Sequence, residues 1–186
     1  MTRSVDIPTL TTERLTLRAQ RPDDFDAYAA FYGSERSWGM GGPLERPQAW
    51  RAFAAELGHW QMRGYGFWAV DVTETGETVG QVGFWHPEGW SEVEIGWAMF
   101  AGSEGKGYAY EAAKAVRDWG LDTLGLTALV SYIDPPNTRS VRLAERLGGW
   151  LDPVASAVVS ADQGEEVVVY RHWPPADSDG GMEAYA

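Results

Sequence analysis

The spacing of hydrophobic positions changes several times along the chain, and each change predicts a different element. Residues 13–19 (ERLTLRA) alternate polar and apolar side chains, which is typical of a strand. Residues 22–32 repeat apolar side chains at helical spacing, and Pro22 with two aspartates suits their first turn. A second helix is predicted from about residue 47 to residue 63, with an apolar face made of Trp50, Phe53, Ala54 and Leu57.

The middle of the chain returns to strand spacing. Residues 66–72 and 78–85 flank the turn TETGE, so these two segments are predicted to form a hairpin. Residues 91–100 (SEVEIGWAMF) alternate strictly. One face of this predicted strand carries Val93, Ile95, Trp97 and Met99, and the other carries Glu92, Glu94, Gly96 and Ala98.

The last third of the chain predicts two more helices and three strands. The helices run from Tyr108 to Leu121 and from Asn137 to Leu147, where two glycines stop the second. The strands are predicted at 128–133 and, as a closing hairpin, at 151–159 and 165–173. The order β-α-α-β-β-β-α-β-α-β-β indicates one mixed α/β domain over residues 1–173. Residues 174–186 are rich in Pro, Gly and Asp, and are predicted to be a disordered tail.

Composition narrows the class of protein. A chain of 186 residues with 44% hydrophobic residues suits one domain with a sizeable core. The absence of Cys excludes disulfides and thiolate metal sites, and the three histidines lack metal-ligand spacing, so no metal is expected. The sequence contains no apolar run of about 18 residues and no secretory signal at its start, so we expect a cytoplasmic protein without a membrane partner.

The charge balance limits the partners. The formal net charge of −12 argues against nucleic acid, because binding to phosphates rests on clustered Lys and Arg. An acidic surface attracts amine-bearing partners, although such a charge also serves solubility alone.

The segment AGSEGKGYAYEAAKAV (101–116) places a glycine-rich loop between a predicted strand and a predicted helix. The free N–H groups of a helix N-terminus and the helix dipole make such a junction an anion site. The loop is no P-loop, because Tyr108 stands where Ser or Thr is needed, and Tyr110 replaces the third glycine of a dinucleotide fingerprint. Taken alone, the loop fits an ordinary helix start equally well.

Three segments occur together in a familiar order: the opening LTTERLTLRAQRPDDFDAY, the loop EGKGYA, and NTRSVRLAERLGG about thirty residues later. Together they resemble the GNAT superfamily of acetyl-CoA-dependent N-acetyltransferases, specifically its ribosomal-protein (Rim-like) branch, from Thr9 to His172. The resemblance implies a single-domain GNAT-type acyl-CoA N-acyltransferase fold, with a mixed central sheet flanked by helices. It also implies acetyl-CoA as cosubstrate.

The family's pyrophosphate motif, Q/R-x-x-G-x-G/A, falls on residues 104–109. Similarity therefore implies that the CoA pyrophosphate is held by Gly105, Lys106, Gly107, Tyr108, Ala109 and Tyr110. Glu104 departs from the motif, so we expect its carboxylate to point outward and Lys106 to supply a cation. Asn137 matches the family's Asn near the pantetheine arm, and it is also a favoured N-cap residue.

Acetyl transfer to an amine needs a base and a proton for the departing thiolate. Ser140 matches the serine proposed as the acid in the Rim-like branch, although a first-turn hydroxyl needs no chemical role. Ala144 stands where many family members have a Tyr acid. Glu94 is the predicted base, with Glu92 in reserve, although alternation alone also places glutamates on a solvent face. The backbone N–H near Trp97 is predicted to polarise the thioester carbonyl.

Trp38, Trp85 and His86 are predicted to line the acceptor pocket, because they lie in or near segments that flank the acceptor in the family. Trp38 can equally fill core beneath the first two helices. The preferred function is an N-acetyltransferase acting on a primary amine, either a small molecule or a protein N-terminus, by direct attack in a ternary complex. A catalytically silent acyl-CoA-binding or sensor module on the same fold is the alternative. The sequence leaves a homodimer open.

Overall fold

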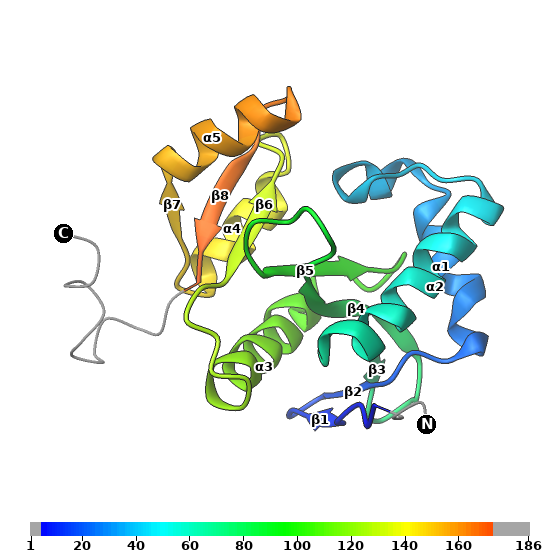
Figure 1. Ribbon diagram of the computed structural model, residues 1–186. Helices are drawn as coiled ribbons and strands as arrows, with labels where there is room; N and C mark the ends of the chain where they lie inside the picture. Colours follow the sequence, from blue (N-terminus) through cyan, green and yellow to red (C-terminus); the bar gives the residue numbers. More distant parts are fainter. Residues whose placement is uncertain (1–4, 173–186) are drawn as a thin grey trace.

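The computed structural model describes residues 5–172, in which an eight-stranded mixed sheet carries helices on both faces (Figure 1). The tail predicted for 174–186 lies outside the described residues. The elements, in chain order, are β1 (Leu10–Thr11), β2 (Leu15–Arg18), η1 (Pro22–Asp24), α1 (Phe25–Tyr32), η2 (Glu35–Met40), α2 (Arg46–Arg63), β3 (Phe67–Val72), β4 (Thr78–Trp85), β5 (Glu94–Met99), α3 (Tyr108–Asp122), β6 (Val130–Ile133), α4 (Thr138–Arg146), β7 (Trp150–Asp152), α5 (Pro153–Gln163) and β8 (Val168–Arg171).

The sheet opens at its centre. Its strand order is β1-β2-β3-β4-β5-β6-β8-β7, and all neighbours pair antiparallel except β5 and β6, which run parallel. The β5–β6 register contains the single pair Glu94–Val130, and the two strands point in different directions in Figure 1. Beyond Glu94, the edge of β5 that faces β6 therefore lies along a gap, while its other edge stays paired with β4.

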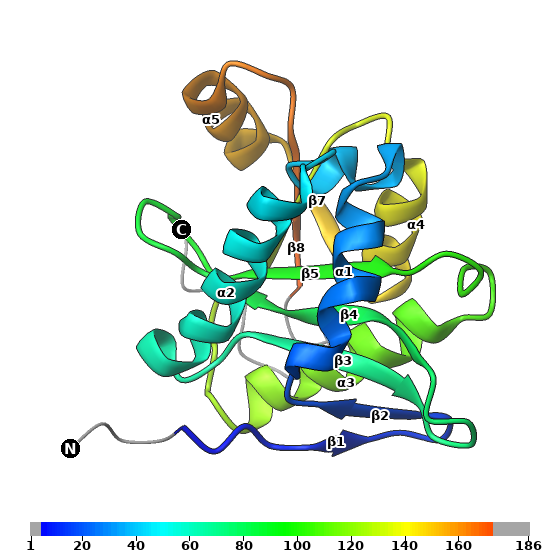
Figure 2. The same ribbon diagram turned by 90° about the vertical axis from the view of Figure 1, so that its right-hand side faces the viewer.

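Helices cover the two faces of the sheet with different partners. Figure 2 shows α1 and α2 in front of the sheet and α3 behind it. Ile95 of β5 packs toward α3 in one apolar cluster, whereas Ala98 joins the cluster of α1 and α2 that includes Tyr28 and Phe53. The alternation predicted for residues 91–100 is therefore present in the fold.

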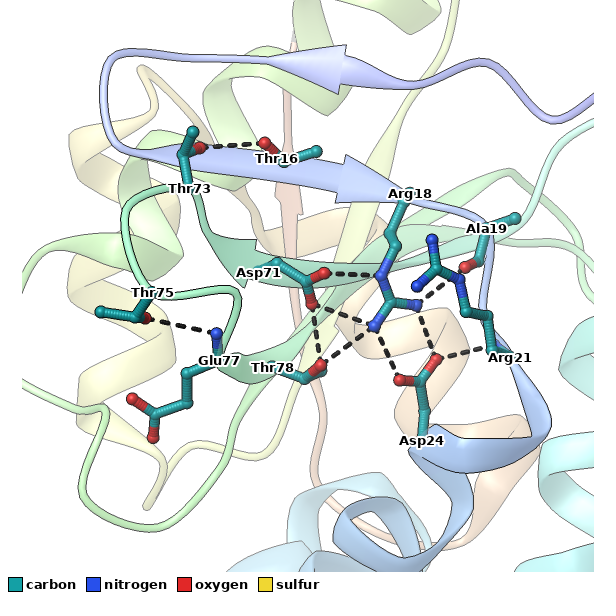
Figure 3. A network of polar contacts seen from close by, with 10 residues as sticks. All are labelled: Thr16, Arg18, Ala19, Arg21, Asp24, Asp71, Thr73, Thr75, Glu77 and Thr78. Carbon is teal, nitrogen blue, oxygen red and sulfur yellow. Dashed lines mark hydrogen bonds and ion pairs between the residues drawn. The ribbon is translucent and has the colours of Figure 1, made fainter.

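A buried arginine fixes the start of α1 to the sheet (Figure 3). The Arg18 guanidinium pairs with Asp24 at 2.8 Å and Asp71 at 2.6 Å, and it donates to the Thr78 hydroxyl at 3.0 Å. These ion pairs raise the pKa of Arg18 further above its ordinary value. The cluster therefore joins β2, η1 and the β3–β4 hairpin through one side chain. Separating these elements would leave a buried charge unpaired, which is strongly destabilising.

One predicted strand is wrong. Residues 151–159 were expected to form an arm of a hairpin, but only β7 is extended, and α5 begins at Pro153. Asp152 caps this helix, since its Oδ1 accepts from the backbone N–H groups of Val154 at 3.0 Å and Ala155 at 2.9 Å. Pro at the first helical position and Gly164 in the left-handed conformation after the last one complete the boundaries.

The apolar face of α2 also differs from the prediction. Trp50 is 59% exposed, and the buried stripe consists of Ala49, Phe53, Glu56, His59 and Trp60. The prediction counted only apolar residues, so it missed a buried face that includes the charged residue Glu56. The rest of the fold prediction is confirmed, because a mixed sheet is flanked by helices. Among the described residues, no helix is long and apolar enough to cross a bilayer.

Candidate active site

The loop between β5 and α3 has the backbone expected of an anion-binding turn. Gly102, Gly105 and Gly107 adopt left-handed φ angles of 81°, 76° and 83°. An added Cβ at Gly105 would meet no atom within 4 Å, so glycine is required there by the backbone conformation rather than by crowding. Gly107 directly precedes α3, a helix of 15 residues whose first-turn N–H groups have no intrahelical partners. The predicted residues 105–110 therefore surround a helix N-terminus suited to an anion.

Two arginines hold the carbonyl groups at the ends of this loop. Arg14 donates to the Lys106 carbonyl at 3.0 Å and forms an ion pair with Glu111 at 2.6 Å. Arg36 of η2 donates to the Met99 carbonyl at 2.8 Å and forms an ion pair with Glu104. The carboxylate that departs from the family motif therefore has a cationic partner of its own.

A cleft of about 710 Å³ lies where β5 and β6 separate. The predicted residues Trp38, Trp85, Glu94 and Trp97 all line it. Trp38 is 45% exposed, so its ring forms part of the cleft wall and does not fill the core.

Glu94 combines two properties of a general base. Its side chain lines the cleft, and the Trp90 indole donates to its Oε2 at 3.0 Å. Burial raises the pKa of Glu94 to about 7, while hydrogen bonds from the Trp90 indole and the Tyr132 backbone limit the rise. A carboxyl with a pKa near 7 can accept a proton at neutral pH.

Glu92, the reserve candidate, is already paired. Arg171 donates to its carboxylate at 2.7 Å and to Asp152 at 2.6 Å. This arrangement joins the segment before β5 to β8 and to the start of α5. Glu92 therefore forms an ion pair with Arg171, whereas Glu94 has no ion pair among the described residues.

Ser140 lies across the gap between β5 and β6 from the main sheet. The Trp97 indole donates to its hydroxyl oxygen at 3.2 Å. The backbone N–H of Ser140 donates to Asn137 Oδ1 at 3.2 Å, so Asn137 is the N-cap of α4. Trp97 lines the cleft and contacts Ser140, which is itself absent from the cleft lining.

His86 has a supporting position and is absent from the cleft lining. Its Nδ1 lies 3.2 Å from the Tyr65 hydroxyl, and its Nε2 lies 3.1 Å from the Trp90 carbonyl oxygen. His86 therefore contacts the segment that carries Trp90, the hydrogen-bond donor to Glu94. His86 thus contacts a residue of the cleft lining, Trp90, without lining the cleft itself.

Sequence reasoning missed Glu56, a buried carboxyl in the cleft wall. Its carboxyl group accepts from the Tyr28 hydroxyl and the Gln20 amide at 2.8 Å, and from the Gln81 amide at 3.1 Å. Burial raises its pKa to about 7, and these three hydrogen bonds limit the rise. The available clue was its spacing, because Glu56 continues the helical stripe of Phe53 and Trp60.

The cleft is acidic and aromatic. Among the residues that the structure describes, the lining includes no Lys, Arg or His, but it includes four carboxyl groups and eight aromatic side chains. The carboxyl groups belong to Glu56, Glu94, Asp134 and Glu165. Burial and the nearby Glu165 raise the pKa of Asp134. Among the described residues, no group of three or more His, Cys, Asp or Glu side chains is arranged to hold a metal ion.

Comparisons with known proteins identify the family and the fold. Residues 14–149 match the acetyltransferase (GNAT) domain family. The crystal structure of an acetyltransferase from Agrobacterium tumefaciens is 45% identical, covers 94% of this chain and 99% of its own, and superposes with a TM-score of 0.83. The uncharacterized protein YkkB of Bacillus subtilis is 36% identical over 97 residues, which span 48% of this chain and 56% of that relative.

A more distant structure has the same fold. RimL, a ribosomal L7/L12 α-N-protein acetyltransferase solved in complex with coenzyme A, is 15% identical. The match covers 88% of this chain and 97% of that one, with a TM-score of 0.69. At this identity the likeness extends to the fold alone.

Proposed function

The chain belongs to the GNAT acetyltransferase family, and we propose that it transfers an acetyl group from acetyl-CoA to a cationic primary amine by direct attack in a ternary complex. The single observation that carries the proposal is the cleft where β5 and β6 separate, which Glu94 lines and Trp97 connects to Ser140.

The donor's position follows from the glycine loop. Acetyl-CoA, when bound, supplies a thioester whose carbonyl carbon accepts the amine. Residues 105–110 would hold the pyrophosphate through backbone N–H groups, because the left-handed glycines and the start of α3 turn these groups toward one site. Asn137 at the start of α4 and Trp97 on β5 would flank the pantetheine arm on the two sides of the gap.

The backbone of β5 supplies a donor for the carbonyl oxygen. The Ile95 carbonyl accepts from the Ser131 hydroxyl at 2.8 Å, so it points toward β6. Peptide groups two residues apart point to the same edge of a strand, and the Trp97 N–H therefore faces the gap beyond the single β5–β6 pair. An N–H group at this position would stabilise negative charge that develops on the thioester oxygen.

Two side chains handle the protons. Glu94 takes a proton from the acceptor ammonium, so that the neutral nitrogen can form the new C–N bond. As the C–S bond breaks, the Ser140 hydroxyl gives its proton to the departing sulfur and regains one from the acetylated nitrogen, which must lose a second proton to become an amide. Glu94 then releases its own proton to solvent. The Trp97 indole N–H donates to the Ser140 oxygen. The Ser140 hydroxyl proton therefore points away from Trp97 and is available to another acceptor.

The lining of the cleft supports a cationic acceptor with an apolar body. Carboxyl groups attract an ammonium ion where the described residues of the lining include no Lys or Arg, and aromatic faces favour contact with it. The acceptor is a small amine or a protein N-terminus, and membership of the Rim-like branch and a cytoplasmic location are part of this proposal. The silent acyl-CoA-binding module gains less support, because simple binding requires neither a carboxyl with a pKa near 7 nor an oriented serine.

An acceptor screen tests the proposal. The purified protein is incubated with acetyl-CoA and a panel of amines, and released thiol and acetylated product are both measured. We expect turnover with cationic amines that carry an apolar body, and none with acidic peptides. If CoA binds in calorimetry but no amine in a broad panel releases thiol, the silent module is correct. If CoA does not bind, both functions are wrong.

A further inference from the structure

Arg36 lies between the two halves of the candidate site. It belongs to η2, the segment that supplies Trp38 and Met40 to the cleft wall. Its guanidinium donates to the Met99 carbonyl at 2.8 Å and pairs with Glu104 in the glycine loop. One side chain from the acceptor wall therefore holds both the beginning of the pyrophosphate loop and its only carboxylate.

Arg36 and Arg14 hold the loop differently. Arg14 is fixed to Glu111 by two nitrogens, with Nε 2.7 Å and Nη2 2.6 Å from Oε2. Among the described contacts, Arg36 reaches the Glu104 carboxylate through Nη2 alone. Both members of this pair are about a third exposed, at 36% and 35%, whereas Glu111 is 18% exposed. Exposed single ion pairs contribute little to stability. Arg36 can therefore change partner at low cost, whereas Arg14 serves as a fixed brace.

The rest of η2 packs closely between α1 and the start of α4. Ser37 is fully buried, and its hydroxyl donates to the Tyr32 carbonyl at 2.9 Å. On the far side, an added Cβ at Gly39 would lie 3.2 Å from Asn137 Nδ2, so η2 packs closely against the start of α4. A displacement at Arg36 would therefore be transmitted along η2 to Trp38 and toward the helix that carries Ser140.

We propose that Arg36 couples the two substrates: its guanidinium exchanges Glu104 for the donor's pyrophosphate and thereby fixes η2 as a wall of the acceptor cleft. The inference rests on the proposed function, because it takes CoA as the occupant of the glycine loop. A guanidinium fork binds phosphate oxygens strongly, and a pyrophosphate offers more negative charge than one exposed carboxylate. Glu104, which the pyrophosphate repels, turns to solvent.

The test compares ligands with and without the pyrophosphate. In calorimetry, Arg36→Ala should weaken CoA binding about tenfold, the size expected for one charge-assisted hydrogen bond, and leave pantetheine binding unchanged. In steady-state kinetics with acetyl-CoA, Arg36→Ala should raise the acceptor KM more than it lowers kcat. With S-acetylpantetheine as donor, the wild type and Arg36→Ala should have the same acceptor KM.

Arg46→Ala is the matched control. Arg46 also pairs with one exposed carboxylate, Asp26, and its guanidinium carbon lies 4.7 Å from the centre of the Phe25 ring, as that of Arg36 lies 5.6 Å from the centre of the Phe31 ring. It stands at the start of α2, outside the loop and the cleft lining, so CoA affinity and acceptor KM should stay at wild-type values.

Further variants separate the possible failures. Arg36→Lys keeps the charge without the fork and should give an intermediate CoA affinity, so the proposal stays testable if Arg36→Ala unfolds. A folded Arg36→Ala or Arg36→Lys protein with wild-type CoA affinity and acceptor KM would overturn the coupling alone. A wild-type protein that does not bind CoA would overturn the proposed function as well.

Discussion

The Trp97 indole donates to the hydroxyl oxygen of Ser140 over 3.2 Å. Trp97 lies on β5 and Ser140 in α4, so the bond spans the place where the sheet opens. A serine oxygen that accepts from an indole presents its own proton in another direction, which suits a proton donor to sulfur. The pair therefore connects the opening of the sheet with the chemistry proposed there.

Ser140→Ala should lower kcat by about 10²-fold through loss of the proton donor, and leave CoA affinity unchanged. Trp97→Phe keeps an aromatic ring and removes the N–H, so it should cause a smaller loss. In the double variant the loss should equal that of Ser140→Ala, because both changes act on one bond. Steady-state kinetics on all three proteins measure this, and losses that multiply would contradict the linked role.

Glu94→Gln should reduce kcat/KM by about 10²–10⁴-fold, because glutamine cannot accept the ammonium proton. In the wild type the carboxyl must be ionised, so kcat/KM should rise with pH through about 7, the pKa that burial produces, and then level off. For Glu94→Gln, kcat/KM should not show this rise between acidic and neutral pH. Glu92→Gln is the control, since Glu92 pairs with Arg171, and it should keep the rise.

Gly107→Glu should abolish measurable CoA binding, because it puts a side chain and a negative charge at the mouth of the anion site. Part of its effect is strain, since φ at Gly107 is 83°. Gly64→Glu carries the same strain, with φ of 79°, at the end of α2. Both variants should lose about 1–2 kcal/mol of stability, and only the first should lose CoA affinity in calorimetry. If the folded Gly107→Glu variant binds CoA as tightly as the wild type, the pyrophosphate site does not lie in this loop.

Trp38→Ala should raise the acceptor KM with little change in melting temperature, because nearly half of this side chain is exposed in the cleft wall. Trp60→Ala provides the contrast. Trp60 is 2% exposed, and its truncation should cost about 3–5 kcal/mol of unfolding free energy. A large stability loss with unchanged acceptor kinetics in Trp38→Ala would show that Trp38 is a core residue.

Glu56→Gln should make the unfolding free energy less dependent on pH. The pKa of Glu56 is about 7 in the folded chain against an ordinary value of 4.5, so the folded chain keeps a proton that the unfolded chain has released between these values. Stability contributed by this group is therefore present below about pH 4.5 and falls as pH rises to about 7, by on the order of 3 kcal/mol. Urea unfolding at several pH values measures the difference from wild type. Parallel curves would contradict the assignment.

Much of the architecture could be predicted from residue spacing. The strict alternation of residues 91–100 predicted β5, and the glycines that follow predicted the loop before α3. Both features depend on local conformation, which residues adjacent in sequence determine. The apolar run at 151–159 misled the prediction because alternate valines and alanines suit either a strand or a helix. Its local boundary signals, Asp152-Pro153 and Gly164, indicate the helix that forms.

The sequence by itself indicated the order of the main elements up to residue 147 and the position of the glycine loop, because these follow from the periodicity of neighbouring residues. Its motifs also resemble those of the family that the comparisons show. Only the tertiary structure decided which polar side chains meet. Glu56 is buried against Gln20 and Gln81, and Arg36 reaches Glu104, over separations that no local pattern encodes. These contacts depend on how α2 and η2 pack across the sheet, since hydrogen bonds and ion pairs form between groups close in space, whatever their distance in sequence.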